Sequence, residues 1–125
     1  MRNDKKNVIV EKSLDFAVQI IGFCEILENN KKFIVSRQML RSGTSIGANI
    51  REAQNAESKT DFIHKMKIAA KEADETSYWL ELCHRANNYP FDESLVTSLN
   101  DISLILSKII STTKKSIKNQ YSDIG

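Results

Sequence analysis

The stretch RSGTSIGANIREA, residues 41–53, decides the fold, because it fits either a phosphate-binding loop or a helix built for close packing. A Walker-type loop needs a lysine and a serine or threonine directly after its last glycine, whereas Ala48 and Asn49 follow Gly47 here. The apolar period continues through both glycines, and no strand pattern precedes them. We therefore interpret the stretch as helical, with a loop as the alternative. Because an interior glycine costs about 1 kcal/mol in helix propensity, we expect a bulky side chain to pack against Gly43 and Gly47.

The composition fits one soluble domain spanning residues 1–125. Hydrophobic residues make up 41% and charged residues 27%, and one proline with four glycines leaves few turns, which argues against an all-β fold. No apolar run is long enough to span a bilayer, and the N-terminus has no signal-peptide stretch. We expect a cytoplasmic protein with no membrane partner, in which Cys24 and Cys83 are buried, reduced thiols.

Apolar residues recur at spacings of three and four along four segments. This pattern predicts helices at about residues 10–28, 32–56, 59–87 and 93–118. Ser58 and Asp92 are the expected N-caps of the third and fourth helices, and residues 119–125 should fray. Because the connections are short, neighbouring helices should be antiparallel. The predicted fold is an all-α, antiparallel, up-down-up-down four-helix bundle.

The first helix carries more apolar surface than one side of a small bundle needs. One stripe at helical spacing comprises Val10, Leu14, Ala17, Ile21 and Cys24. A second stripe lies beside it, and two large apolar residues of the third helix fall outside that helix's core stripe. We predict that another copy of the chain covers this surplus surface. The expected oligomer interface comprises Phe16, Ile20, Phe23, Leu27, Trp79 and Leu82.

The nearest match to a metal motif is Glu81-Leu-Cys-His84, which has the Glu-x-x-His spacing of di-iron bundles, and Asp61-Phe-Ile-His64 nearly has it. Both segments lie on the third helix, so their histidines are about 30 Å apart and cannot share a metal within one chain. No HExxH motif, Cys-x-x-Cys pair or nucleophile elbow is present. We expect no catalytic residue, metal site or cofactor, and a metal-dependent enzyme is the least favoured alternative.

Basic residues gather in two places although the net charge is only +2. Arg37, Arg41 and Arg51 fall on one side of the second helix, and Lys114, Lys115 and Lys118 lie near the end of the fourth. We take these six as candidate nucleic-acid-binding residues, because stacked basic side chains can bind phosphates. The arginines could equally form ion pairs with another subunit or lie in solvent, and lysines also favour helix C-termini.

Two polar residues flank the inward stripe of the second helix. If Asn49 and Glu52 are buried there, they need partners, which a neighbouring chain could supply.

The segment from Arg41 to Leu82 resembles a family of small bacterial four-helix-bundle proteins encoded within intervening sequences of 23S ribosomal RNA genes. The family pattern is Arg followed by Ser-Ile-x-x-Asn-Ile-x-Glu. This chain matches it at Arg41, Ser45, Ile46, Asn49, Ile50 and Glu52. It departs from the family at Gly47 and Ala53, where many members have proline and glycine. The resemblance covers about residues 8–118 and implies a left-handed bundle that assembles as a ring, a homopentamer in known members.

The resemblance does not assign an activity to the chain. A similar relative is the accessory protein of diversity-generating retroelements, a basic ring that works with a reverse transcriptase and nucleic acid, and this chain is less basic. Our leading hypothesis is a non-enzymatic, ring-forming interaction protein that serves as an RNA or other nucleic-acid accessory factor. The alternative is a structural protein–protein adaptor with no nucleic-acid binding.

Overall fold

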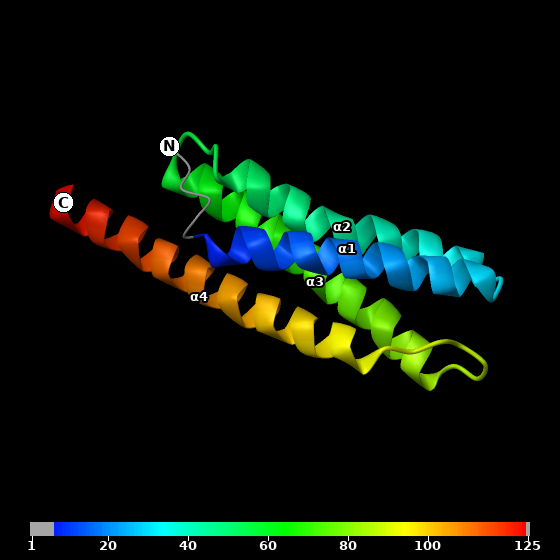
Figure 1. Cartoon of the computed structure of the whole chain (residues 1–125). Coiled ribbons are helices and arrows are strands. Elements are labelled where there is room, and N and C mark those ends of the chain that lie inside the picture. The colour runs from blue at the N-terminus through cyan, green and yellow to red at the C-terminus, as the bar shows by residue number, and fades with distance from the viewer. Residues whose placement is uncertain (1–6, 125) are drawn as a thin grey trace.

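The structure is a computed structural model that describes residues 7–124, in which four helices and no strand occur. The helices are α1 (Val8–Asn29), α2 (Phe33–Ala53), α3 (Lys59–Arg85) and α4 (Glu93–Ile124). They alternate in direction along the bundle, as Figure 1 shows. The prediction of an all-α, up-down-up-down four-helix bundle is confirmed. The ends of the predicted domain, residues 1–6 and 125, lie outside the described residues.

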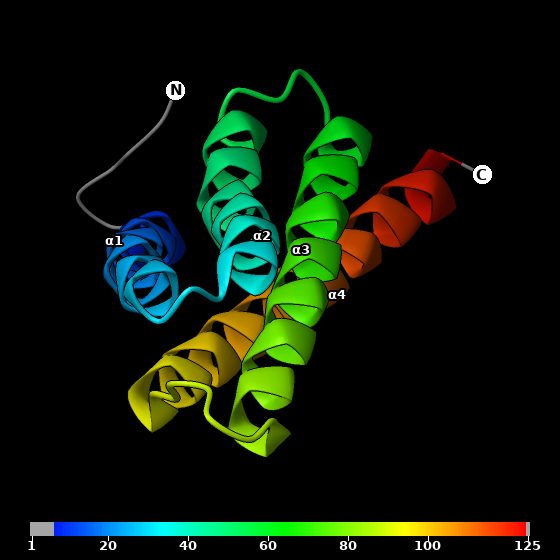
Figure 2. The same cartoon turned by 90° about the vertical axis from the view of Figure 1, so that its right-hand side faces the viewer.

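Each helix packs against its two neighbours around the bundle, α1 against α2 and α4, and α3 against α2 and α4. The diagonal pairs stay farther apart, since no Cα atom of α1 lies within 8 Å of one in α3. α4 runs obliquely to α1, and its C-terminal part, orange to red, projects past the ends of the other helices (Figures 1 and 2). One end of α4 is therefore covered on fewer sides than the rest of the bundle.

Side-chain caps set the starts of three helices. The Ser58 hydroxyl accepts a hydrogen bond from the amide of Asp61 at 3.0 Å, and an Asp92 carboxylate oxygen accepts one from the amide of Ser94 at 3.0 Å. Both predicted N-caps are thereby confirmed. The Asn7 side chain caps α1 in the same way. These bonds satisfy amides that have no partner within the helix itself.

Two predicted helix ends differ from the structure by three residues or more, and the other ends agree to within two. α2 ends at Ala53 instead of residue 56, because a turn at Gln54 and Asn55 precedes the Ser58 cap. α4 continues to Ile124 instead of fraying after Lys118. Its last residues before Gly125, which lies outside the described range, include no glycine or proline to stop the helix.

The predicted close helix packing at the glycines of α2 is confirmed, but a bulky side chain lies against Gly43 only, since Gly47 meets Ser13. A Cβ atom added at Gly43 would lie 2.9 Å from Cγ2 of Ile20, a side chain with no exposed surface. A Cβ atom at Gly47 would lie 3.3 Å from the carbonyl oxygen of Ser13. α1 therefore rests directly on the two glycines, and this packing offsets their low helix propensity.

The predicted interface residues on α1 are wrong. Phe16, Ile20, Phe23 and Leu27 are at most 4% exposed and form part of the core of a single chain. They cannot also form a surface for another copy. The first stripe is the partly uncovered one, since Leu14 and Ile21 are each 46% exposed and the adjacent Val18 is 62% exposed. The surplus apolar surface exists, but it lies on the opposite side of α1.

One segment of the described chain, Glu93–Tyr121 in α4, is long and apolar enough to cross a membrane by length and composition alone. The core helix of a soluble bundle meets the same criterion, and Leu95, Leu99, Ile102 and Leu106 of α4 are buried in the core. Only 22% of the most apolar part of this segment is buried within one chain. The large apolar side chains of α4 that are exposed are Leu104 and Tyr121.

Candidate functional site

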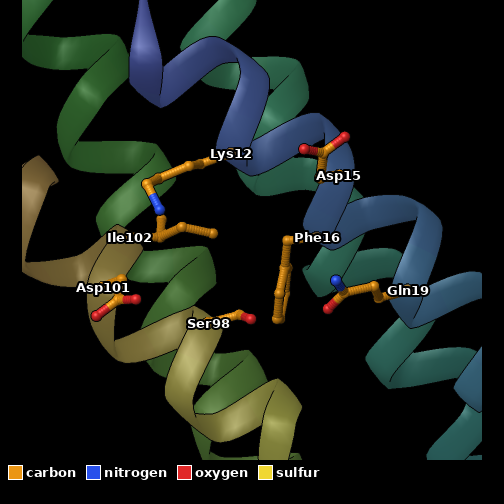
Figure 3. Close-up of a pocket in the computed structure, with 7 residues that line it drawn as sticks. All are labelled: Lys12, Asp15, Phe16, Gln19, Ser98, Asp101 and Ile102. Carbon is orange, nitrogen blue, oxygen red and sulfur yellow. The ribbon is translucent and has the colours of Figure 1, made fainter.

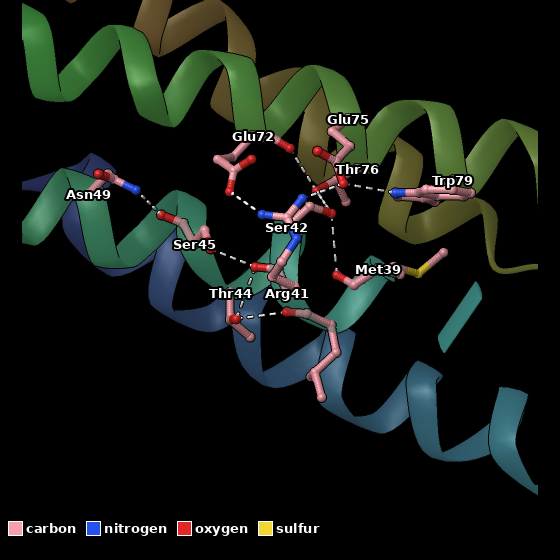
Figure 4. Close-up of polar contacts among 11 residues, drawn as sticks. Met39, Arg41, Ser42, Thr44, Ser45, Asn49, Glu72, Glu75, Thr76 and Trp79 are labelled. Carbon is pink, nitrogen blue, oxygen red and sulfur yellow. Dashed lines mark hydrogen bonds and ion pairs between the residues drawn. The ribbon is translucent and has the colours of Figure 1, made fainter. Parts of the chain in front are cut away.

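The arginine of the sequence pattern joins α2 to α3. Arg41 donates from Nη1 to Glu72 at 2.9 Å and from Nη2 to Glu75, and the indole of Trp79 donates to the same Glu75 carboxylate at 3.1 Å (Figure 4). Beneath the contacts of Arg41 with the two glutamates, the hydroxyl of Thr76 donates to the hydroxyl of Ser42 at 2.8 Å in the buried interface between α2 and α3. The arrangement fixes the register of the two helices.

These contacts change the charge balance of the seam between α2 and α3. Hydrogen bonds from Arg41 and Trp79 lower the pKa of Glu75 below its usual value of 4.5. The same Glu75 contact raises the pKa of Arg41. Two carboxylates therefore neutralise the Arg41 guanidinium within one chain, and Arg41 is not a free ligand for phosphate.

The other pattern residues also find partners in their own chain. Ser45 donates to the carbonyl of Arg41 at 2.6 Å, and Asn49 donates to the carbonyl of Ser45 at 2.9 Å (Figure 4). Glu52 is exposed and pairs with Lys65 of α3 at 3.0 Å. Asn49 is half-buried and Glu52 is exposed, so neither side chain needs a partner from a neighbouring chain. The pattern marks the seam between α2 and α3.

The three predicted arginines do not converge on one site. Arg41 turns toward α3, whereas Arg51 lines a hollow on the other side of α2, together with Leu14 and Ala17 of α1. Arg37 is exposed. Because the side chains of Arg41 and Arg51 lie on different sides of α2, these two residues cannot contact one phosphate group together.

A different basic cluster forms where α3 meets the projecting end of α4. We define the lysine cluster as Lys59, Lys67, Lys71 and Lys114. The ammonium of Lys59 donates to the hydroxyl of Ser116 at 2.6 Å, which places the start of α3 beside the end of α4. The pKa of Lys67 is lowered from 10.5, first by the charge of Lys114 and to a smaller extent by that of Lys71. Like charges are thus held close together on an exposed face.

Sequence reasoning found only one residue of this cluster. Lys114 was predicted, whereas Lys67 and Lys71 were missed, although their spacing of four residues puts both on one side of α3. Lys115 and Lys118 are exposed on the same end of α4. The signal that could have found the cluster is the antiparallel pairing of α3 with α4, which brings these segments together.

An exposed apolar face lies on α1, and the projecting end of α4 carries a partly covered one. The α1 face comprises Leu14, Val18, Ile21 and Gly22, with the exposed acids Glu11 and Glu25 on the same helix. The α4 end comprises Ile109, Ile110, Ile117 and Tyr121, with Lys108, Lys114, Lys115 and Lys118 on the same segment. Tyr121 is 67% exposed and the three isoleucines are partly buried.

The remaining predicted interface residues, Trp79 and Leu82, keep part of their surface. Tyr78 stacks edge-on against Trp79, with ring centroids 5.0 Å apart, and is itself exposed. Leu82 and Tyr78 line an open hollow on the outside of α3. The prediction that another chain covers this patch stays a prediction.

The two thiols are buried and free, as the sequence indicates. Burial raises the pKa of Cys83 to about 11 and also raises that of Cys24. Because α1 and α3 keep their Cα atoms more than 8 Å apart, the two cysteines are too distant for a disulfide. Among the described residues, no group of three histidine, cysteine or acidic side chains is placed to hold a metal ion.

A polar cleft of about 180 Å³ opens between α1 and α4 (Figure 3). Lys12, Asp15 and Gln19 line it from α1, and Ser98 and Asp101 line it from α4. Its walls carry both charge signs, and Lys12 forms no ion pair with either aspartate among the described residues. The cleft selects no single class of ligand by its charge.

The fold and these surfaces define a class: a small all-α bundle whose most distinctive sequence pattern holds two helices together and whose outer helices leave apolar surface uncovered. A family model for 23S rRNA-intervening sequence proteins matches residues 5–112. The chain therefore belongs to the 23S rRNA-intervening sequence protein family.

One solved relative supports this assignment. It is a crystal structure, at 1.70 Å resolution, of a protein of unknown function from the S23 ribosomal protein family of Bacteroides thetaiotaomicron VPI-5482. The two chains are 50% identical with a TM-score of 0.78, and the match covers 82% of this chain and 98% of the other. The comparison with curated proteins finds no match.

Proposed function

We propose that this protein is a non-enzymatic interaction protein whose copies assemble into a closed ring, a homopentamer as the family resemblance implies, in the cytoplasm. The observation that carries the proposal is the exposed apolar α1 face, flanked by Glu11 and Glu25, for which the partly covered apolar α4 end of another copy, on a lysine-bearing segment, supplies a complementary surface. Contacts between two different surfaces propagate from copy to copy, and they form a ring when the rotation closes.

The two surfaces complement each other physically. Burial of Leu14, Val18 and Ile21 against the isoleucines of α4 removes apolar surface from water, at about 25 cal/mol per Å². Glu11 and Glu25 on one side and Lys118, on the flank of Ile117 and Tyr121, on the other bring opposite charges together, which favours this pairing over α1 against α1.

Gly22 supports the same contact. Nothing in the chain lies within 4 Å of a Cβ atom added there, so no packing within one copy offsets its cost of about 1 kcal/mol in helix propensity. A glycine on an exposed apolar face allows the backbone of a neighbouring helix to approach closely. We assign the projecting α4 of the next copy as the helix that packs against Gly22.

Substitutions on the two surfaces test the assembly. Val18→Glu, at a side chain that is 62% exposed, should leave the bundle folded and reduce the particle from about 71 kDa, five chains of 14.2 kDa, toward the single chain. Ile34→Glu is the matched control, because Ile34 is 73% exposed and lies on neither surface. Equal masses for both variants in sedimentation equilibrium would remove the α1 face from the proposal.

We further propose that the ring binds RNA through the lysine cluster. Repetition of the cluster around a ring concentrates a modest charge into a basic rim. Binding should weaken steeply with salt, and each lost phosphate contact should reduce the slope of log K against log salt by about 0.7–0.9.

A gel-shift salt titration with a structured RNA tests this part. Lys67→Gln combined with Lys114→Gln should reduce both the affinity and the salt slope, whereas Lys12→Gln combined with Lys31→Gln removes the same charge elsewhere and should change little. If the cluster variant and its control retain RNA equally, the lysine cluster is not the binding surface.

The second candidate function is a protein–protein adaptor without nucleic acid. The exposed Tyr78 beside Trp79 and the hollow at Leu82 favour it, because aromatic residues are enriched at protein interfaces. Under this alternative no RNA is retained at low salt, and a Tyr78→Ala variant loses its protein partners while a Lys67→Gln variant keeps them.

A further inference from the structure

At the opposite end of α4 from the lysine cluster, a cavity of about 180 Å³ lies between α3 and the first turns of α4. Its floor is apolar, formed by the buried side chains of Leu80 and Leu99 with Val96 beside them. Neither the seam between α2 and α3 nor the assembly surfaces use it. The cavity is somewhat larger than an apolar cavity of about 150 Å³ that accepts benzene.

One wall of the cavity is a stacked pair of rings. The imidazole of His84 and the ring of Phe91 have centroids 4.3 Å apart and planes inclined by 20°. His84 belongs to α3 and Phe91 to the segment before α4, so the stack holds the connection against the helix. Because the two rings already pack on each other, this wall is preformed, which reduces the entropy lost when a ligand binds.

The remaining lining is polar, with the neutral Ser77 and Asn100 and with negative charge from two separate elements. Glu81 comes from α3 and Glu93 from the first turn of α4. Glu81 also pairs with Arg85 at 3.3 Å, but both side chains of that pair are mostly exposed. An exposed pair of this kind contributes little, so it does not prevent Glu81 from binding another cation. Glu93 forms no ion pair with the residues described.

We propose that this cavity is a binding site for a small organic amine, a protonated ammonium group carried on a short apolar or aryl group. The apolar part enters the cavity over Leu80 and Leu99, and the ammonium group lies at the mouth between the carboxylates of Glu81 and Glu93. Charge-assisted hydrogen bonds to the carboxylates select a cation over a neutral molecule of the same shape. The site stands independently of the proposed assembly and RNA binding.

Benzylamine is the probe, and benzyl alcohol is its neutral counterpart of nearly the same size. A ligand of this size should bind the full-length protein with a dissociation constant on the order of a millimolar. Benzyl alcohol should bind at least about tenfold more weakly. The two histidines provide an internal control, because ring proton signals of His84 in NMR titrations should shift, whereas those of His64, about 30 Å along the same helix, should not.

Two variants separate the charge from the cavity. Glu81→Gln combined with Glu93→Gln keeps the shape and should abolish the preference for benzylamine, whereas Glu57→Gln combined with Asp74→Asn removes two acids elsewhere and should preserve it. Val96→Phe fills the cavity and should weaken both probes. Circular dichroism verifies that each variant is folded. Equal affinity for the two probes, or shifts at His64 as large as those at His84, would overturn the proposal.

Discussion

The contact between Gly43 and Ile20 yields the most quantitative prediction. In the native chain a methyl group at residue 43 would lie 2.9 Å from Cγ2 and 3.0 Å from Cγ1 of Ile20. Both atoms lie next to the branch point of a buried side chain, so they cannot move aside without a change of rotamer. Overpacking of this kind costs about 1–3 kcal/mol.

The helix propensity of alanine opposes that cost. Replacing an interior glycine by alanine gains about 1 kcal/mol, so Gly43→Ala should destabilise the protein by about 0–2 kcal/mol. An Ile20→Ala background removes both close atoms and leaves the Cβ of residue 20 at 3.4 Å, an ordinary contact distance, so the same substitution should stabilise by about 1 kcal/mol. The coupling energy between the two sites should therefore be about 1–3 kcal/mol.

Urea denaturation followed by circular dichroism at one fixed protein concentration measures all four corners of this cycle. In a Val18→Glu background, in which the proposed assembly is disrupted, Gly22→Ala is the matched control, because an added methyl group there meets nothing within 4 Å in the single chain and should stabilise it by about 1 kcal/mol. If Gly43→Ala stabilises as much as Gly22→Ala and shows no coupling to Ile20, the close approach of α1 and α2 is wrong.

Two further predictions concern titratable groups. The pKa of Glu75 is depressed in the folded protein, so the stabilisation from its ionised form is complete above pH 4.5 and is lost as the pH falls through the lower folded-state pKa. The difference in unfolding free energy between wild type and Arg41→Met, measured by urea denaturation, should therefore narrow from pH 6 to pH 3. A constant difference would refute the ion pair. Burial raises the pKa of Cys83 to about 11. Ellman's reagent at pH 8 should therefore react with Cys24 and Cys83 of the native protein far more slowly than with the same thiols of the unfolded chain. Equal reaction rates would show that the thiols are accessible.

The sequence was informative where one local rule determines the structure. Ser58 and Asp92 cap their helices because a side-chain oxygen directly before a helical apolar period accepts a hydrogen bond from a free amide of the first turn. Gly43 and Gly47 lie in a helix under α1, as the unbroken period indicates. Local rules also place each helix to within a few residues.

The sequence was misleading on α1, where two stripes satisfy the same spacing. Periodicity gives the angle between the stripe of Phe16 and Ile20 and that of Leu14 and Ile21, but it does not say which one faces inward. The answer depends on Gly43, whose missing side chain admits Ile20, and this complementarity between two helices is visible only once they are docked.

The candidate sites depended on pairings that no local pattern contains. Arg41 meets Glu72 and Glu75 across a separation of more than 30 residues, and Lys67 meets Lys114 through the packing of α3 on α4. In both cases the residue types were visible in the sequence, whereas the neighbour that decides their role was not. Arg41, which we predicted to bind phosphate, therefore joins α2 to α3 in the structure.

The mass of the wild-type particle tests the central claim most directly, namely that the α1 face of one copy covers the α4 end of the next. Sedimentation equilibrium at micromolar concentration should give about 71 kDa, five times the 14.2 kDa of one chain. A mass of 14.2 kDa, with the helical circular dichroism of a folded bundle, would contradict the account, because both apolar surfaces would then be stable in water without a partner.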